Sequence, residues 1–218
     1  MNKYKDKYIK YKKLCTNILK KELCFDFYFM HHMFQKIGKS HDKIENEFLK
    51  IIKDGYLRSS SETNNIKLGG DVPLKDIYMN IYFPDLNNLN TRYGMSLIIS
   101  PLLMFDNDIR FRKGWQGHET NFLRKTDSIK KIEKNIREIK EYIKNPEKYK
   151  DMYKNFSGEM THELVTSKNI SLEDHLLGII CYKCNKDNIK KLLKGTKIEN
   201  IKIYIKGEEL PTLKELLE

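Results

Sequence analysis

Residues 25–34 read FDFYFMHHMF, and this stretch decides the fold class of the chain. Aromatic residues have a high β-propensity and no Gly or Pro interrupts the run, so the stretch predicts a buried strand. Two histidines, His31 and His32, lie inside it. Because neighbouring residues of a strand point to opposite faces of the sheet, only one of the two can face a given cleft.

Short strands and amphipathic helices alternate along the rest of the chain. The predicted strands cover residues 76–83, 94–100, 162–166, 177–182 and 198–205, and Pro84 and Pro101 end the first two. The predicted helices cover residues 44–52, ended by Gly55, residues 129–143, begun by Ser128, and residues 188–193, ended by Gly195. Residues 104–127 are expected to be irregular. The strands are too short and scattered for a doubly wound sheet, so the predicted fold class is mixed α+β.

A lysine-rich segment precedes the domain. In residues 1–23, Tyr4, Tyr8, Tyr11, Leu14 and Ile18 recur at spacings of three and four, which predicts an amphipathic helix. Its plain interpretation is a solvated helix packed along one stripe, and the alternative is an arm that contacts a polyanion. The 218-residue chain is therefore expected to form this helix and a single domain over residues 24–218.

The net charge of the chain is large, but it is only a weak guide to the binding partners of the protein. The formal net charge is +11, but the chain contains no alanine, and Lys, Ile and Asn number 35, 25 and 18. All three have AT-rich codons, so part of the basic excess reflects genome composition rather than selection for polyanions. No run of about 18 apolar residues is present and the first residues are too charged for a signal peptide, so we expect no membrane association and an intracellular location, cytoplasmic or nuclear.

The four cysteines do not make a disulfide scaffold in a chain of this length. Cys181 and Cys184 form one C-x-x-C pair, but Cys15 and Cys24 lack the spacing of the other half of a zinc site. Because Cys181 follows the apolar stretch 176–180, it is interpreted first as a strand residue, and a metal or redox role is the alternative.

The sequence contains no strong local motif for a known enzymatic activity. The sequence has no phosphate-binding loop, no G-x-G-x-x-G, no H-E-x-x-H and no G-x-S-x-G. What stands out is a set of polar side chains in predicted strands: the two histidines, Glu163, and the pair Tyr78 and Tyr82 on one face of their strand. Carboxylates are seldom buried without a partner or a task, which makes Glu163 a candidate catalytic group.

The order of these residues resembles that of the ADP-ribosyltransferase superfamily. A strand with His is followed by a helix that runs into IKDGYL at residues 52–57, then by a strand with aromatics, by Ile99-Ser100-Pro101, by a helix, and by a strand with Glu163. The sequence is most similar to the branch with a His–aromatic–Glu triad, which includes poly-ADP-ribosylating enzymes, RNA 2′-phosphotransferases and DNA-modifying toxin transferases. The resemblance covers about residues 25–205 and implies a compact, ADP-ribosyltransferase-like split β-sheet flanked by helices, preceded by the N-terminal Lys-rich helix.

Carried over residue by residue, the resemblance implies that His32 is the first-strand His, with His31 as the alternative register. It implies that Tyr82, or else Tyr78, is the middle-strand aromatic and that Glu163 is the catalytic acid. The implied substrate is NAD and no metal is expected; the implied NAD-binding residues are His31, His32, Tyr78, Tyr82 and Ser100.

Two further features of the sequence bear on this resemblance. The family usually has His-Gly-Thr or His-x-Thr in the first strand, whereas this sequence has His32-Met33-Phe34, so the hydroxyl partner is missing. The N-terminal tract Lys-Tyr-Lys-x-Lys-Tyr resembles the openings of many large DNA virus proteins, so a viral protein acting in a host cell is expected.

The chemistry of such a triad follows from the bond that is broken. Cleavage of the nicotinamide–ribose bond passes through an oxocarbenium-like state, as glycoside cleavage does. A carboxylate on the ribose 2′-hydroxyl stabilises the developing positive charge, which is the role implied for Glu163. The resemblance implies that His32 forms hydrogen bonds with the ribose hydroxyls and that Tyr82 stacks on the nicotinamide ring.

Three functions remain open on the sequence. The first is an NAD-dependent ADP-ribosyltransferase that modifies a protein or nucleic acid, and the second is a non-catalytic module that binds nucleic acid or nucleotide on the same fold. The third is a metal-dependent hydrolase built on His31, His32, His162 and Glu163, which the adjacency of the two histidines disfavours. The cluster Arg110, Arg112, Lys113 and Trp115 is a candidate nucleic-acid contact, and its alternative is a loop that the Trp anchors to the core.

Overall fold

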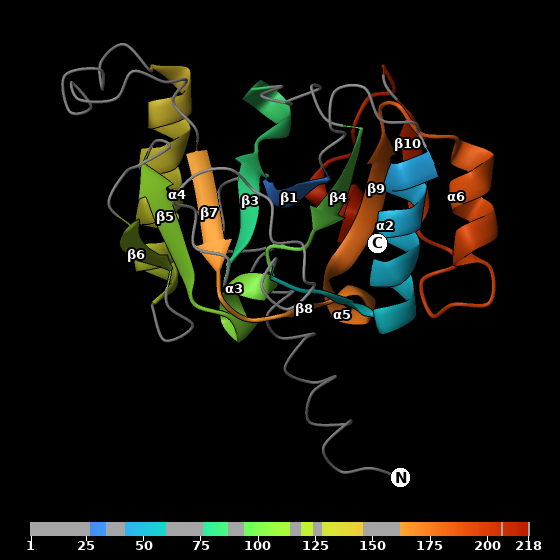
Figure 1. Ribbon diagram of the computed structural model, residues 1–218. Helices are drawn as coiled ribbons and strands as arrows, with labels where there is room; N and C mark the ends of the chain where they lie inside the picture. Colours follow the sequence, from blue (N-terminus) through green and yellow to red (C-terminus); the bar gives the residue numbers. More distant parts are fainter. Residues whose placement is uncertain are drawn as a thin grey trace, which may run out of the picture.

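An eight-stranded sheet with the strand order β10-β9-β4-β1-β3-β7-β5-β6 forms the centre of the protein (Figure 1). Its strands are β1 (Tyr28–Met33), β3 (Ile77–Tyr82), β4 (Met95–Ile99), β5 (Ile109–Lys113), β6 (Glu119–Leu123), β7 (His162–Thr166), β9 (Leu176–Cys181) and β10 (Lys202–Ile205). Neighbouring strands are antiparallel, apart from the parallel pair β9 and β10. The computed structural model describes residues 27–33, 42–59, 76–86, 94–113, 119–123, 128–145, 162–205 and 207–217.

Helices and a small second sheet surround this centre. The helices are α2 (Asp42–Asp54), α3 (Leu103–Asp106), α4 (Ile129–Lys144), α5 (Leu172–His175), α6 (Lys186–Leu193) and α7 (Leu213–Leu217), with a 3-10 turn at Pro84–Leu86. Strands β2 (Tyr56–Leu57) and β8 (Ile170–Ser171) pair antiparallel as a two-stranded sheet. Figure 1 shows α2 and α6 side by side at the β9–β10 end of the large sheet and α4 beside β5 and β6 at the other end. Among the described helices, none has the length and apolar character needed to cross a membrane.

The larger core lies on one face of the sheet. Alternate residues of the central strands point into it, including Phe29, Met79 and Leu97. Phe48 of α2 and Ile136 of α4 cover them from the helices, and all five side chains are buried. Each such burial stabilises the fold by about 1.5–3 kcal/mol, which is why the apolar stripes of the helices turn to this face.

The opposite face carries a smaller, tyrosine-rich core. Tyr28, Met30, Tyr82, Ile98 and Ile180 are buried there, and Leu210 and Leu216 of the C-terminal segment pack against them. Gly178 of β9 makes this packing possible: an added Cβ would lie 3.1 Å from both the Ile98 and the Tyr204 side chains.

The sheet consists of two four-stranded halves that are joined only between β1 and β3. Their pairing runs from Tyr28 opposite Tyr82 to Met30 opposite Asn80 and ends there. The last residues of β1 continue to pair with β4, as far as Met33 opposite Met95. On its other edge, β3 pairs with β7 from Asn80 to Ile77, whereas no β1–β3 pair is recorded for β3 before Asn80. The two halves therefore separate at the middle of the sheet, beside the two histidines.

Most elements expected from the sequence are confirmed. Strands β1, β3, β4, β7 and β9 and helices α2, α4 and α6 lie within a few residues of their predicted positions. Gly55 and Gly195 have φ of 75° and 77° after α2 and α6, as expected of left-handed helix ends. The Ser128 side chain accepts a hydrogen bond from the Lys131 amide at the start of α4. The predicted N-terminal helix over residues 1–23 lies outside the described residues.

Two predictions are wrong. Residues 104–127 contain the end of α3 and the hairpin strands β5 and β6, because pairing with β7 stabilises a segment whose polar residues hide any strand pattern. The last strand begins at Lys202 rather than Ile198, since residues 197–200 form turns. Cys181 ends strand β9, as expected of a strand residue, and it also forms a disulfide with Cys184, because the C-x-x-C turn brings the two residues together.

Candidate functional site

Strand register places the candidate triad on one face of the sheet. Tyr82 lies opposite Tyr28, and His32 follows Tyr28 by four residues, so the two share a face. Glu163 lies opposite Asn80, which is two residues from Tyr82 and therefore on this face as well. Three neighbouring strands, β1, β3 and β7, thus present His32, Tyr82 and the position of Glu163 to the same side. This is the face of the smaller, tyrosine-rich core.

His31 points to the other face and takes a different role. Its Nδ1 donates a hydrogen bond to the carbonyl oxygen of Tyr78 at 2.8 Å. Tyr78 lies just beyond the last β1–β3 pair, so its carbonyl receives no backbone hydrogen bond from β1. The His31 side chain supplies this hydrogen bond where the two halves of the sheet separate. Burial lowers the pKa of His31, and the hydrogen bond acts in the opposite direction. The strand pairing therefore places His32, and not the alternative His31, on the same face as Tyr82.

His32 is held by a serine from the neighbouring strand. Its Nδ1 lies 2.6 Å from Oγ of Ser96, which is its register partner in β4. His32 is 8% exposed and Ser96 is fully buried. Burial lowers the pKa of His32 to about 3, with a smaller contribution from the charge of His31, so the imidazole is neutral at pH 7. In the neutral ring one nitrogen is a donor and the other an acceptor, and the contact with Ser96 engages Nδ1.

The two candidate tyrosines differ in accessibility. Tyr82 is 4% exposed, and its ring packs on Tyr28 with centroids 5.0 Å apart. Burial raises the pKa of Tyr82 above its usual value. Tyr78 lies on the same face but is only partly buried, four residues closer to the end of β3 that bears Asp76. Tyr78 is therefore the more accessible of the two rings.

Glu163 occupies a position between two polar residues of neighbouring strands. Its register partners are Asn80 on β3 and Arg112 on β5, one on each side. Directly opposite residues of antiparallel strands have Cβ atoms about 4.5–5.5 Å apart, so all three positions adjoin on one face. The side chains of Glu163 and Arg112 lie outside the described part of the structure, and their backbone positions alone support this neighbourhood.

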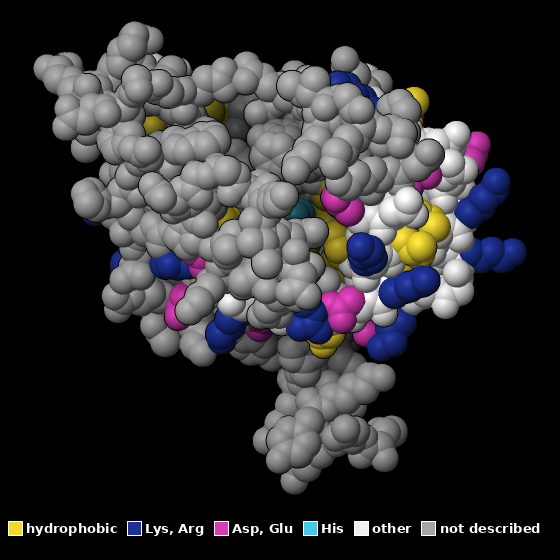
Figure 2. All heavy atoms as spheres, viewed as in Figure 1, with side chains coloured by type: hydrophobic (Ala, Val, Ile, Leu, Met, Phe, Trp, Pro, Cys, Tyr) yellow, Lys and Arg dark blue, Asp and Glu magenta, His cyan; other side chains and the backbone are white. Residues whose placement is uncertain are grey.

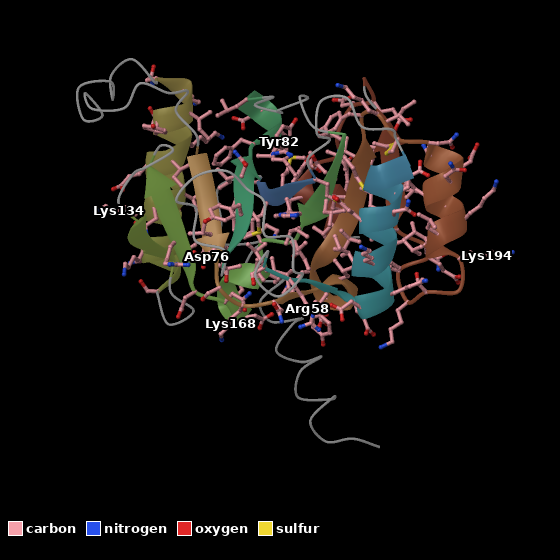
Figure 3. All side chains as sticks on the ribbon, viewed as in Figure 1. Arg58, Asp76, Tyr82, Lys134, Lys168 and Lys194 are labelled. Atoms are coloured by element: carbon pink, nitrogen blue, oxygen red, sulfur yellow. A yellow bond between two sulfur atoms is a disulfide. The ribbon has the colours of Figure 1, made fainter. Side chains whose placement is uncertain are left out.

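The predicted basic cluster is divided by the structure. Arg110 of β5 forms an ion pair with Asp76, which is 4% exposed at the start of β3. Figure 3 shows Asp76 and Tyr82 at opposite ends of this strand. Arg112 and Lys113 belong to β5 by their backbone, whereas Trp115 lies outside the described residues. Arg110 is thus engaged with Asp76 within the protein, and it lies in a strand rather than in a loop.

We expect Asp76→Asn to destabilise the protein by about 1–3 kcal/mol, because it removes the charged partner of Arg110 at a buried site. Urea unfolding monitored by circular dichroism measures the change. Glu138→Gln is the matched control, since the exposed Lys134–Glu138 pair at 3.9 Å should contribute less than about 0.5 kcal/mol. Equal effects of the two substitutions would show that the Asp76 pair is not a structural contact.

Charges on the described surface are mixed rather than separated by sign. Figure 2 shows Lys and Arg side chains in dark blue over the α2 and α6 side of the molecule, with acidic side chains between them. Among the described residues, Lys197 pairs with Glu173 at 2.6 Å and Lys186 with Glu208 at 3.7 Å. The described part of this face therefore carries no continuous positive patch of the kind that favours nucleic acid.

The remaining predicted site residues lie away from the triad or are not brought together. Ser100 is fully buried after β4, and its Oγ accepts a hydrogen bond from the Leu102 amide. His31 and His32 lie on opposite faces, so they do not supply two ligands of one metal site. Within the described residues, no group of three His, Cys, Asp or Glu side chains is placed to hold an ion.

Two residues of this face were not predicted from the sequence. Ser96 and Asn80 are polar residues in otherwise apolar strands, which is the signal that singled out Glu163. Their partners, His32 and Glu163, are 64 and 83 residues away along the chain, and only strand register links them.

Comparison with known sequences places the chain in a family. Residues 24–146 match the model of a family of unknown function, DUF5846. The chain belongs to the DUF5846 family. A similar relative is the uncharacterized protein R11 of Acanthamoeba polyphaga mimivirus, 31% identical over 241 residues, which cover 99% of this chain and 85% of the relative.

The DUF5846 match includes β1, β3, β4 and β5 and therefore His32, Ser96 and Asn80, whereas Glu163 lies beyond it. The mimivirus relative extends over both parts and supports the viral character expected from the N-terminal tract. No solved structure is significantly similar to this DUF5846 chain.

Proposed function

We propose that this protein is an NAD-dependent ADP-ribosyltransferase that modifies a protein or nucleic acid. The observation that carries the proposal is the strand register that gives His32, Tyr82 and Glu163 a common face on β1, β3 and β7. The sequence resemblance named these three residues from their order alone, and nothing in that order requires them to share a face. The separation of the sheet beside His32 is a second point of agreement, since the resemblance implies a split sheet.

In this proposal each residue of the face has one task. The Glu163 carboxylate accepts a hydrogen bond from the ribose 2′-hydroxyl and stabilises positive charge on the sugar. The bond between the nicotinamide nitrogen and ribose C1′ breaks with its electron pair on nicotinamide, and a nucleophile of the acceptor forms the new bond to C1′. The His32 imidazole contacts a ribose hydroxyl, and Tyr78 or Tyr82 stacks on the nicotinamide ring. Tyr78 is the better placed of the two because its ring is more accessible.

Ser96 replaces the hydroxyl that the sequence lacks after His32. The family's hydroxyl follows the His along the strand, whereas Ser96 approaches His32 from the neighbouring strand at 2.6 Å. A buried imidazole bonded at one nitrogen has a defined ring orientation, which favours binding of a hydroxyl at the other nitrogen. The absence of Thr at position 34 is thus compatible with an ordered His32.

Calorimetry with NAD tests the proposal, with nicotinamide release assayed in parallel. The expected result is binding by the wild-type chain, lost or strongly weakened in His32→Ala. Absence of binding at millimolar NAD would overturn the proposal. A second candidate function, a non-catalytic nucleotide- or nucleic-acid-binding module, is favoured by one observation, the register of Arg112 beside Glu163. Binding without any nicotinamide release would support this second function.

Ser96→Ala is expected to weaken NAD binding about fivefold to tenfold and to destabilise the fold by about 1–2 kcal/mol, because it leaves a nitrogen of buried His32 without its partner. Calorimetry and urea unfolding measure the two effects. Thr166→Val is the control, since Thr166 is a buried hydroxyl residue on the other face of β7. If both variants bind NAD like the wild type, Ser96 has no part in orienting His32.

A further inference from the structure

The disulfide between Cys181 and Cys184 lies where β9 leads into α6. Cys181 is the last residue of β9, 3% exposed, and pairs with Met95 of β4. Cys184 is only partly buried and precedes Asn185, the N-cap of α6. The Cα atoms of the two cysteines are 5.3 Å apart, within the range of about 4.4–6.8 Å that disulfides require. Cys184 is thus the more exposed of the two cysteines, and a disulfide with a partly exposed member is of the kind that exchanges with small thiols.

The two residues between the cysteines connect this pair to the candidate site. The amides of Tyr182 and Lys183 both donate to the carbonyl oxygen of Gly94, at 3.1 and 3.0 Å, directly before β4. The Tyr182 ring packs against the tyrosine-rich core. Ser96 pairs with Ile180, two residues before Tyr182, and both Ile180 and Tyr182 belong to the tyrosine-rich core, so Tyr182 lies beside Ser96 on this face. Burial raises the pKa of Tyr182 to about 12. Because Ser96 bonds His32, the turn closed by the disulfide lies beside the Ser96–His32 pair.

We propose that Cys181 and Cys184 are a reversible dithiol–disulfide site whose oxidation holds Tyr182 against Ser96 of the candidate site. The redox site itself stands on the two cysteines alone. Its effect on NAD binding rests on the proposed function, because it acts through the residues that orient His32.

The oxidation needs a small-molecule disulfide, such as oxidised glutathione, as the electron acceptor. The thiolate of the accessible Cys184 attacks one sulfur of this disulfide and displaces the first small thiol, which leaves a mixed disulfide on Cys184. The Cys181 thiolate then attacks the Cys184 sulfur and displaces the second small thiol. Two electrons pass from the protein to the small disulfide, and the two protons of the cysteine thiols end on the two thiols released.

Equilibration of the full chain in glutathione buffers tests the redox site. After acid quenching and alkylation, trypsin cleaves at Lys183, so the two cysteines lie on separate peptides that stay joined only when they are disulfide-bonded. The joined pair is expected to appear in one reversible transition as the share of oxidised glutathione rises. Cys15→Ser/Cys24→Ser should retain the transition and Cys184→Ser should abolish it. Alkylation of both cysteines at every buffer composition would overturn the proposal.

Two measurements on the oxidised and reduced chain test the link to Tyr182. Hydrogen exchange of the Tyr182 and Lys183 amides is expected to be faster in the reduced chain, because the turn loses one of its constraints. NAD binding is expected to be about fivefold weaker in the reduced chain, and Cys184→Ser should match the reduced chain in both buffers. Equal exchange and equal affinity in the two states would overturn the link. If neither state binds NAD, the proposed function fails, while the joined peptides and the amide exchange still decide the redox site and its link to Tyr182.

Discussion

Glu163→Gln is expected to lower the rate of nicotinamide release from NAD by at least about 100-fold while changing the Kd for NAD by less than about threefold. Glutamine keeps the size and most of the hydrogen-bonding capacity of the side chain, so the ground-state complex should persist. It lacks the negative charge that stabilises the oxocarbenium-like state, so only the chemical step should suffer. Release of nicotinamide followed by chromatography, with Kd from calorimetry, separates the two quantities.

Glu173→Gln is the matched control for this substitution. Glu173 is an exposed carboxylate that pairs with Lys197 at 2.6 Å, outside the candidate face. Its replacement should leave both the rate and the Kd unchanged. A Glu163→Gln variant that releases nicotinamide within threefold of the wild-type rate would contradict the catalytic role of Glu163, even if the protein cleaves NAD.

Lowering the pH from 7 to 4 is expected to remove about 3 kcal/mol of stability through His32 alone. The pKa of this histidine is about 3 in the folded protein, because of burial, against an ordinary value of 6.5. Between these values the unfolded chain binds a proton that the folded chain does not, so stability falls as the pH falls from 6.5 towards 3. Well above pH 6.5 neither state is protonated, and the contribution of His32 to stability no longer changes with pH. His31, whose pKa is also lowered, acts in the same direction.

His32→Asn isolates this effect, because Asn retains a polar partner for Ser96 but does not titrate. Urea unfolding at pH 7, 5.5 and 4.5 gives the free energy of unfolding of both proteins. The variant is expected to be less stable at pH 7 but to lose less stability on acidification than the wild type. Parallel losses in the two proteins would show that His32 is not held neutral by burial.

Local sequence patterns predicted the elements that combine strong periodicity with clear end signals. The isoleucine stripe of α4 and its Ser128 cap are of this kind, as is β3 ended before Pro84. In both, side chains and breakers within one element carry the information. The hairpin β5–β6 lacks such a pattern, since its residues include Arg110, Arg112 and Lys113, and pairing with β7 stabilises it. A strand that depends on a distant partner leaves little trace in its own sequence.

The candidate site was likewise predicted only in part from the sequence. The sequence resemblance named His32, Tyr82 and Glu163 and left His31 open as the alternative to His32. Alternation along a strand already required the two histidines to face opposite sides. Which of them joins Tyr82 depended on the register of β1 against β3 and β4, which no local pattern encodes.

The sequence by itself determined the mixed α+β class, the position of most helices and strands, and the separation of the histidines onto two faces. These depend on the propensity and periodicity of residues close together in the chain. The tertiary structure alone decided the strand order, the division of the sheet between β1 and β3, and the contacts of His32 with Ser96 and of Asp76 with Arg110. The two side-chain contacts join residues 64 and 34 positions apart. They arise because burying two apolar faces at once permits only one register of the strands.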